Sequence, residues 1–169
     1  MVQGLSVYAA KWIQAQGDAE TLALDVPLLR WSSAVPEVED LAFATQPGGL
    51  LQVPAAGDSW IFELRKDSTK KNPFVMGITL GRNENNDLVL RHSGISRFHA
   101  YFQREPKSGH WRLVDTGSKN GTWAAGLKLA PSQPRVLEAL TELRVGDLQL
   151  TFYTPAAFAE LLRTQMREH

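Results

Sequence analysis

Residues 111–123, WRLVDTGSKNGTW, place a short apolar strand, a loop and the start of a second strand next to one another. The first four residues mix apolar and polar side chains as a half-buried strand does, and residues 148–152, LQLTF, alternate as clearly. The loop between is rich in Gly, Ser, Asn and Asp, which favour turns. The segment therefore predicts consecutive strands joined by a tight loop.

Similar short runs, rich in Val, Ile, Phe, Tyr and Trp, continue through residues 60–154, with clusters of Gly, Asn, Asp, Ser and Pro between them. Eight such runs without intervening helices predict an all-β fold, an antiparallel β-sandwich. The runs are WIFELR (60–65), VMGITLG (75–81), DLVL (87–90), FHAYFQR (98–104), HWRLVD (110–115), TWAA (122–125), RVLEA (135–139) and LQLTFYT (148–154).

Two shorter parts flank the predicted sandwich domain, residues 60–154. Residues 1–59 are expected to form an acidic N-terminal extension that packs on this domain, with a short amphipathic helix over residues 5–15 and an irregular stretch after it. Residues 155–169 predict a C-terminal helix, because proline suits its first turn and apolar residues recur at helical spacing.

Length and composition exclude several classes of protein. The chain has 169 residues, 43% of them hydrophobic, which suffice for one buried core and are few for two independent domains. It has no cysteine, which fits a reducing compartment, so we expect a cytoplasmic protein. No run approaches about 18 apolar residues, so we expect no membrane association. A monomer is the expected state.

Charge is spread unevenly, although 18 basic and 18 acidic residues cancel. Residues 1–59 hold two basic and seven acidic residues, a balance of −5, whereas residues 81–125 hold seven and four, a balance of +3. A neutral total gives no general attraction to polyanions, and +3 is small for a nucleic-acid surface. We therefore expect no nucleic-acid binding, but a local excess of cations.

Ser96 and His99 are spaced such that they could be a nucleophile and its base. A nucleophilic serine normally lies on a tight turn between a strand and a helix. Here residues 93–100, SGISRFHA, run into an apolar strand, in which positions three apart point to opposite faces. The pattern disfavours a hydrolase, and no other acid, base or cofactor loop indicates an enzyme.

The histidines do not predict a metal site. None of the four has HxH or HxxxH spacing to another, and no cysteine can complete a tetrahedral set. His99 lies between apolar residues at the start of a strand, where a buried imidazole hydrogen-bonded to backbone is expected. We therefore predict a structural role for His99, and neither a metal nor a cofactor.

Three predicted loops carry side chains that suit a bound phosphate. A phosphate monoester has roughly 1.5 to 2 negative charges and three acceptor oxygens at pH 7. Charged donors form hydrogen bonds with it that are about twice as strong as neutral ones, and a hydroxyl or amide adds further donors. The combination, more than any one residue, predicts an anion site. Its candidate residues are Arg82, Ser96, Arg97, Lys119 and Asn120.

Five motifs, in order and spacing, resemble those of the forkhead-associated (FHA) domain family. The resemblance covers about residues 60–154 and implies a twisted sandwich of the SMAD/FHA type, which binds phosphothreonine peptides through loops at one end. The motifs are LGR (80–82), NDLVL (86–90), ISRFHA (95–100), LVDTGSKNGTW (113–123) and LRVGDLQLTF (143–152).

The resemblance implies contacts for each candidate binding residue. Arg82 matches the arginine that grips the phosphate, and Ser96 matches the serine whose hydroxyl bonds a phosphate oxygen. Arg97 and Lys119 occupy positions where some family members add a phosphate contact. Asn120 matches the residue that hydrogen-bonds the peptide backbone beside the phosphothreonine.

Other matching residues are implied to support the site. His99 corresponds to a histidine that braces the binding loop, and Gly81 and Gly121 permit tight turns. Asp115 and Ser118 are interpreted as loop-shaping.

One turn departs from the family pattern. Where members often carry a second Asn-Gly pair, this chain has Ala125 and Gly126. Asn-Gly suits the positive φ angles of a type I′ hairpin turn, so an altered turn is expected here.

The function implied is that of a non-catalytic, phosphothreonine-dependent protein-binding module in signalling downstream of Ser/Thr kinases. The alternative is a phosphate-independent interaction or assembly module on the same fold. The partner, its kinase and its preferred flanking sequence are not predicted.

Overall fold

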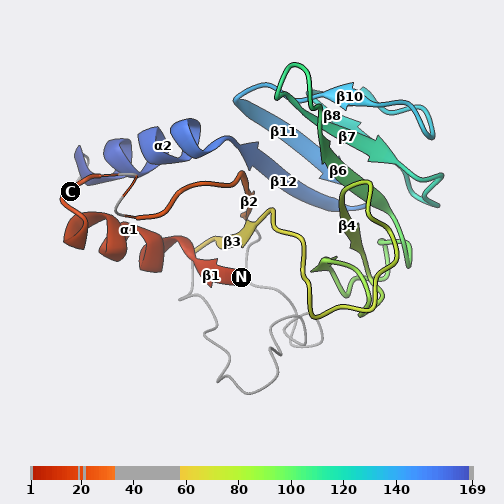
Figure 1. Cartoon of the computed structure of the whole chain (residues 1–169), viewed down its shortest axis with the longest axis horizontal. Helices are drawn as coiled ribbons and strands as arrows, with labels where there is room; N and C mark the ends of the chain where they lie inside the picture. Colours follow the sequence, from red (N-terminus) through yellow and green to blue (C-terminus); the bar gives the residue numbers. More distant parts are fainter. Residues whose placement is uncertain (1, 19, 21, 33–57, 168–169) are drawn as a thin grey trace.

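The computed structural model describes residues 2–18, 20, 22–32 and 58–167, which fold into two sheets and two helices (Figure 1). Strands pair antiparallel, except for the parallel pair β4 and β5. The predicted antiparallel sandwich with a helix near each end is confirmed. In spatial order, the strands of sheet A are β1 (Val2–Gly4), β3 (Trp60–Glu63), β2 (Leu28–Trp31), β12 (Leu148–Tyr153), β11 (Leu140–Val145), β8 (Thr122–Ala124) and β9 (Leu127–Lys128). Those of sheet B are β10 (Arg135–Val136), β7 (Trp111–Asp115), β6 (Ala100–Arg104), β4 (Ile78–Gly81) and β5 (Leu88–Val89). The helices are α1 (Leu5–Gln14) and α2 (Pro155–Arg167).

The sandwich core lies between the two sheets and is built by alternate residues of their strands. Phe102 of β6 and Phe152 of β12 stack across it, with ring centroids 6.4 Å apart and an interplanar angle of 12°. In β11, Leu143 and Val145 are buried in this core, whereas Glu142 is exposed and Arg144 is partly exposed. The period of two therefore decides which side chains fill the sandwich.

Part of sheet A is buried on both faces. Leu29 and Phe62 belong to the sandwich core, whereas their chain neighbours Leu28 and Ile61 belong to a second cluster under the helices. Phe158 of α2 is fully buried in that cluster. Because successive strand residues point to opposite faces, this double burial explains the consecutive apolar residues of β2 and β3.

Helix α1 is attached to both sheet A and α2. Its Tyr8 ring meets Phe158 edge-on, with centroids 5.3 Å apart, and the Tyr8 hydroxyl donates to a Glu63 carboxylate oxygen at 2.8 Å. Burial, with this hydrogen bond, raises the pKa of Tyr8. At the N-terminus of the helix, the Ser6 hydroxyl donates to Asp58 at 2.6 Å. The segment before β2 is thus packed into the fold by specific contacts.

The N-terminal segment differs from expectation in one respect. The irregular stretch predicted after the first helix is wrong for Leu28–Trp31, which forms β2 and pairs with both β3 and β12. This run is only four residues long, and partners far along the chain hold it as a strand. Residues 33–57 lie outside the described part of the chain. The domain limits 1–59, 60–154 and 155–169 stay predictions.

The turn between β8 and β9 also differs from expectation. Ala125 and Gly126 form it, with φ angles of 50° and 77°. Positive φ at both central residues is what a type I′ turn requires. The prediction of an altered turn is therefore wrong. The turn keeps positive φ angles at both central residues, and Ala125 adopts the left-handed conformation.

The two helices lie at the left of Figure 1, whereas the loops that join β4 to β5 and β5 to β6 lie at the lower right. None of the helices in the described residues is long and apolar enough to cross a membrane.

Candidate functional site

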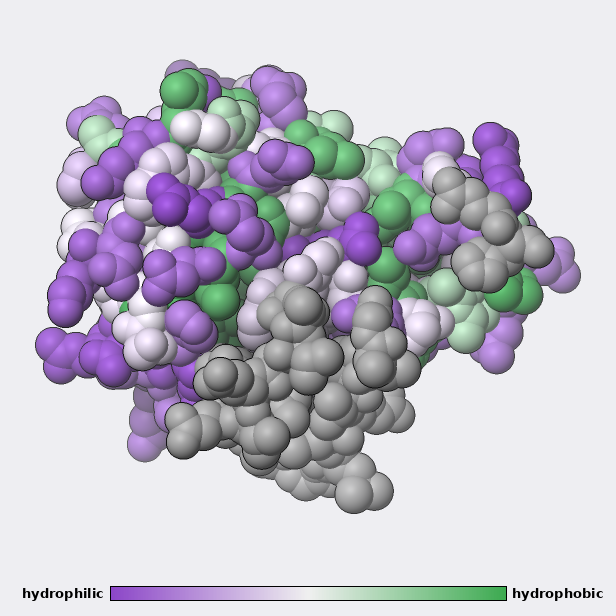
Figure 2. All heavy atoms as spheres, turned by 180° about the vertical axis from the view of Figure 1, so that it is seen from behind, coloured by the Kyte–Doolittle hydropathy of each residue, from purple (hydrophilic) through white to green (hydrophobic). Residues whose placement is uncertain are grey.

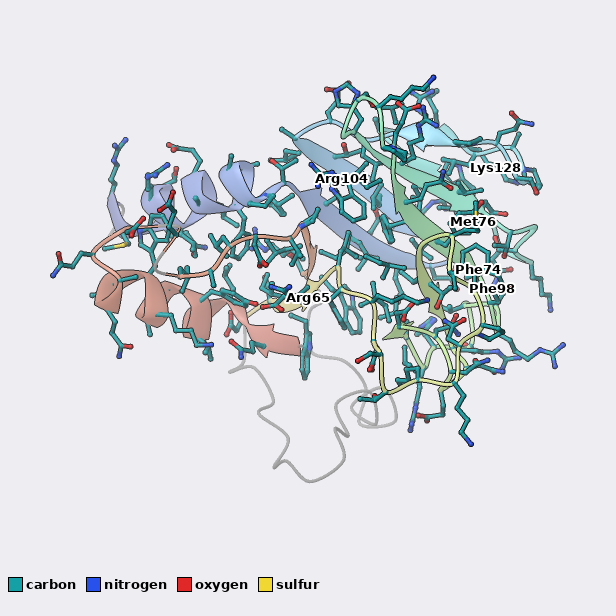
Figure 3. All side chains as sticks on the ribbon, in the orientation of Figure 1. Arg65, Phe74, Met76, Phe98, Arg104 and Lys128 are labelled. Atoms are coloured by element: carbon teal, nitrogen blue, oxygen red, sulfur yellow. The ribbon has the colours of Figure 1, made fainter. Side chains whose placement is uncertain are left out.

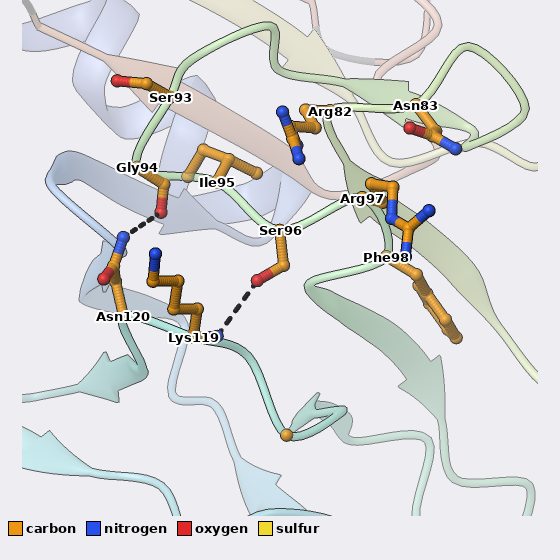
Figure 4. A pocket seen from close by; sticks show the side chains of 11 residues that line it. Arg82, Asn83, Ser93, Gly94, Ile95, Ser96, Arg97, Phe98, Lys119 and Asn120 are labelled. Carbon is orange, nitrogen blue, oxygen red and sulfur yellow. Dashed lines mark hydrogen bonds between the residues drawn. The ribbon is translucent and has the colours of Figure 1, made fainter.

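A pocket of about 730 Å³ opens between three loops, which join β4 to β5, β5 to β6, and β7 to β8 (Figure 4). All five side chains predicted to bind a ligand line it. The structure therefore brings together residues that are up to 38 positions apart in the chain, from Arg82 to Asn120 (120 − 82). Six further lining residues were not predicted as ligand contacts: Asn83, Ser93, Gly94, Ile95, Phe98 and Gly117.

Ser96 and Asn120 hold the loops together across the pocket. The Ser96 hydroxyl oxygen accepts a hydrogen bond from the Lys119 backbone N–H at 3.0 Å, and the Asn120 side-chain amide donates to the Gly94 carbonyl at 2.9 Å (Figure 4). A hydroxyl has one proton to donate besides its acceptor positions. The bond to Lys119 therefore leaves the Ser96 proton available for a ligand.

Three cations line the pocket together with this hydroxyl (Figure 4). Arg82, Arg97 and Lys119 are exposed, and within the described residues none of them forms an ion pair with a carboxylate. By contrast, Arg91 on the same connection pairs with Glu84. Seen from behind, hydrophilic side chains cover much of this end of the molecule, at the left of Figure 2. The pocket therefore presents positive charge that is not neutralised by described neighbours, and it suits an anion.

His99 lies beneath the pocket and links two of its loops. Its side chain is fully buried, Nδ1 accepts from the Ser96 backbone N–H at 3.0 Å, and Nε2 lies 3.1 Å from the Gly121 carbonyl oxygen. Because Nδ1 accepts, the proton is on Nε2, which donates to Gly121. Burial lowers the pKa of His99, against opposing effects of Gly121 and Asp115. The imidazole is therefore neutral at pH 7 and positions both loops.

Asp115 organises the β7–β8 loop from below. One of its carboxylate oxygens accepts from the Gly117 and Ser118 amides at 2.7 and 2.9 Å, and the other accepts from the Ser118 and Thr122 hydroxyls. Burial acts to raise the pKa of Asp115, but these hydrogen bonds outweigh it and the pKa lies below its ordinary value. The carboxylate thus stays ionised and sets the course of the loop that carries Lys119 and Asn120.

Two glycines are required by close approaches or by backbone angle. A Cβ atom on Gly81 would lie 2.2 Å from the Arg97 carbonyl oxygen, far inside van der Waals contact. Gly121 has a φ of 84°, and a Cβ there would meet the Trp123 ring at 2.9 Å. A larger residue at position 81 would displace the backbone of Arg97, which lines the pocket, and one at position 121 would strain the backbone and crowd the Trp123 ring.

Asn86 supports the site and was not predicted to do so. Its side chain is 3% exposed, and Nδ2 donates to the carbonyls of Asn83 at 2.9 Å and Arg97 at 2.7 Å. It thereby joins the β4–β5 loop to the segment that carries Arg97. The only sequence signal was its place at the start of the NDLVL motif.

The geometry of Ser96 and His99 does not resemble a nucleophile and base. The imidazole Nδ1 bonds the Ser96 backbone amide, while the hydroxyl bonds Lys119 on another loop. A base must lie within hydrogen-bond reach of the proton that it removes. The described residues also contain no group of three or more His, Asp or Glu that could hold a metal ion.

Comparison with known proteins finds similarity over part of this sandwich. Residues 78–146 match the model of the FHA domain family. Among characterised relatives, the oxoglutarate dehydrogenase inhibitor of Corynebacterium diphtheriae is 35% identical over 74 residues, which cover 44% of this chain and 48% of that protein. The human angiogenic factor with G patch and FHA domains 1 is 36% identical over 83 residues, covering 44% and 11%. The similarity thus spans about half of the first relative and about a tenth of the second.

The fold is also that of solved FHA domains. An engineered FHA domain, solved with a Myc-pTBD peptide, superposes with a TM-score of 0.51 over 82% of this chain and 98% of the other at 21% identity. This similarity extends beyond residues 78–146 and supports the assignment of the sandwich architecture.

Proposed function

We propose that the pocket binds phosphothreonine in a partner protein, and that the chain is a non-catalytic, phosphothreonine-dependent binding module downstream of a Ser/Thr kinase. One observation carries the proposal: three cations that pair with no carboxylate among the described residues line the same pocket as a hydroxyl whose proton is free to donate. A phosphate ester offers two negative charges at most and several acceptor oxygens to this set of donors. Phosphothreonine is also the ligand that the FHA resemblance implies.

Each of the five predicted ligand contacts has a role in the proposal. The Arg82 guanidinium and the Ser96 hydroxyl bind phosphate oxygens, and Arg97 and Lys119 add charge. Asn120 keeps one amide proton and its carbonyl oxygen after bonding Gly94, and with these it binds the peptide backbone. Beneath them, His99, Gly81 and Gly121 keep the loops in place.

The test is a titration of the full chain with three matched peptides that carry phosphothreonine, phosphoserine or threonine. Their common sequence is chosen by selection from a phosphothreonine-centred library. We expect no measurable binding of the threonine peptide. Burial of one methyl group is worth about 0.8 kcal/mol, so phosphothreonine should bind about fourfold more tightly than phosphoserine.

Equal affinity for all three peptides would contradict the proposal. Partner binding that survives both phosphatase treatment and Arg82→Ala would instead favour the phosphate-independent interaction module.

A further inference from the structure

An apolar ridge adjoins the pocket, made of Phe74, Val75, Met76, Phe98 and Tyr101. Val75 is 84% exposed, Met76 68% and Phe98 39%. The Phe74 ring centroid lies 5.4 Å from that of Phe98 and 4.7 Å from that of Tyr101. Figure 3 shows Phe74, Phe98 and Met76 near one another on the side of β4 and β6. Single exposed apolar residues are ordinary, whereas such a group marks an interaction surface.

Hydrogen bonds fix the loop that carries the ridge. The Lys66 ammonium donates to the Phe74 carbonyl at 2.6 Å and to the Asp87 carboxylate at 2.9 Å, and the Asp87 side chain is fully buried. The Asn72 side chain donates to the Thr79 hydroxyl at 2.7 Å and accepts from the Phe74 backbone N–H at 3.0 Å. The loop therefore presents its exposed apolar side chains in one arrangement, which lowers the entropic cost of binding.

Phe98 belongs to both the pocket and the ridge. It follows Arg97 on the pocket wall, and its ring contacts Phe74 on the loop outside the pocket. The surface thus changes from cationic to apolar within two neighbouring residues. A ligand that covers both parts has an anionic group close to an apolar side chain.

We infer that the ridge is a second recognition subsite, which binds an aliphatic or aromatic side chain of the phosphopeptide within a few residues of the phosphothreonine. This inference rests on the proposed function of the pocket. An extended peptide advances about 3.3 Å per residue. If one peptide residue contacts Phe98, the residue two or three positions along the peptide can therefore reach past Phe74. The subsite selects among phosphothreonine proteins by the residues that flank the modified position.

The experiment uses the full chain and phosphothreonine peptides with serine at all other variable positions. Leu or Phe is then placed singly at each of four positions on either side, and affinities are measured by fluorescence anisotropy. At one position at least, Leu or Phe should increase the affinity about fivefold over serine, as expected for partial burial of one apolar side chain.

The double variant Val75→Ser/Met76→Ser should reduce this preference to about twofold or less and leave the affinity for the all-serine peptide unchanged. Both side chains are exposed, so the fold should persist, as circular dichroism can verify. The matched control is Ile13→Ser on α1, at a residue 59% exposed and far from the pocket, which should keep the full preference.

Absence of an apolar preference, or a preference that persists in the double variant, would overturn the subsite while phosphothreonine binding stands. Failure of every phosphorylated peptide to bind would overturn both the proposed function and this inference.

Discussion

At the scale of single residues, the pocket depends on which atoms are already engaged by the protein itself. The Ser96 oxygen and one Asn120 proton are used between loops, whereas Arg82 has no carboxylate partner among the described residues. Removal of Arg82 should therefore affect a ligand and leave the loops intact. Removal of the Ser96 hydroxyl should affect both ligand binding and the contact between the loops.

Arg82→Ala should weaken phosphothreonine peptide binding by about 10- to 100-fold, because a hydrogen bond to a charged group is worth about 1.5 to 3 kcal/mol. Ser96→Ala should weaken it by about tenfold. Calorimetric titration measures both effects, and the melting temperature of Arg82→Ala should stay at the parent value. Arg104→Ala removes an exposed cation that does not line the pocket, so equal losses in Arg104→Ala and Arg82→Ala would refute a specific contact.

His99 should make stability depend on pH. Its pKa is lowered in the folded state, so between that lowered value and the ordinary value of 6.5 the unfolded chain binds more protons than the folded chain. The free energy of unfolding should therefore rise with pH in this window and fall as the solution is acidified below 6.5. One proton contributes at most about 1.4 kcal/mol per pH unit.

Urea denaturation at several pH values between 5 and 8 measures this slope. His99→Gln should flatten it and lower the stability by about 1 to 3 kcal/mol, because the Ser96 amide and the Gly121 carbonyl lose a buried partner. The exposed His110 provides the control, and an identical loss of slope in His110→Gln would contradict the assignment.

At the scale of elements, the β8–β9 turn stores a local strain. Ala125 has a φ of 50°, a conformation that costs L-residues other than Asn, Asp and Gly roughly 1 to 2 kcal/mol. Its side chain is exposed, so Asn fits there without a clash.

Ala125→Asn should raise the free energy of unfolding by about 0.5 to 1 kcal/mol, because Asn tolerates the left-handed region and Asn-Gly favours this turn. Thermal or urea denaturation measures the change. Ala130→Asn is the control, since Ala130 is exposed and lacks a positive φ, and it should not stabilise the chain. Equal gains in both variants would show that strain at residue 125 is not the cause.

Prediction from sequence succeeded where local pattern and fold agree. Short runs of apolar residues predicted strands such as β7 and β12, and apolar residues at helical spacing predicted the helices α1 and α2. β11 was missed because Glu142 and Arg144, at its outward positions, interrupt the apolar run, although its buried residues alternate regularly. The five pocket residues could be named from motifs. The roles of Asn86 and Phe98 could not, because contacts across loops decide them.

At the scale of the whole molecule, the sandwich and the outer helices form one connected structure. β2 lies between β3 and β12, and α1 packs against α2 over the same sheet. The matched FHA segment, residues 78–146, contains none of β1, β2, α1 and α2. Stability of the chain should therefore depend on residues well outside the matched segment.

A fragment that begins at residue 60 should fail to unfold cooperatively, because β3 and β12 lose the strand between them and the helix cluster loses Tyr8 and Trp12. Near-ultraviolet circular dichroism during heating measures this loss. Addition of a peptide spanning residues 2–32 should restore part of the transition. If the fragment alone melts like the full chain, the domain that begins at residue 60 does not need β2 for its stability.

The distance between the helices and the pocket loops gives the chain a natural attachment point. α2 ends at Arg167 on the side of the molecule away from the loops around Arg82 and Ser96 (Figure 1). An immobilisation tag or fluorophore placed there leaves the pocket facing the solvent. A bead or sensor chip loaded in this orientation should capture phosphoproteins from a mixture without shielding by the support.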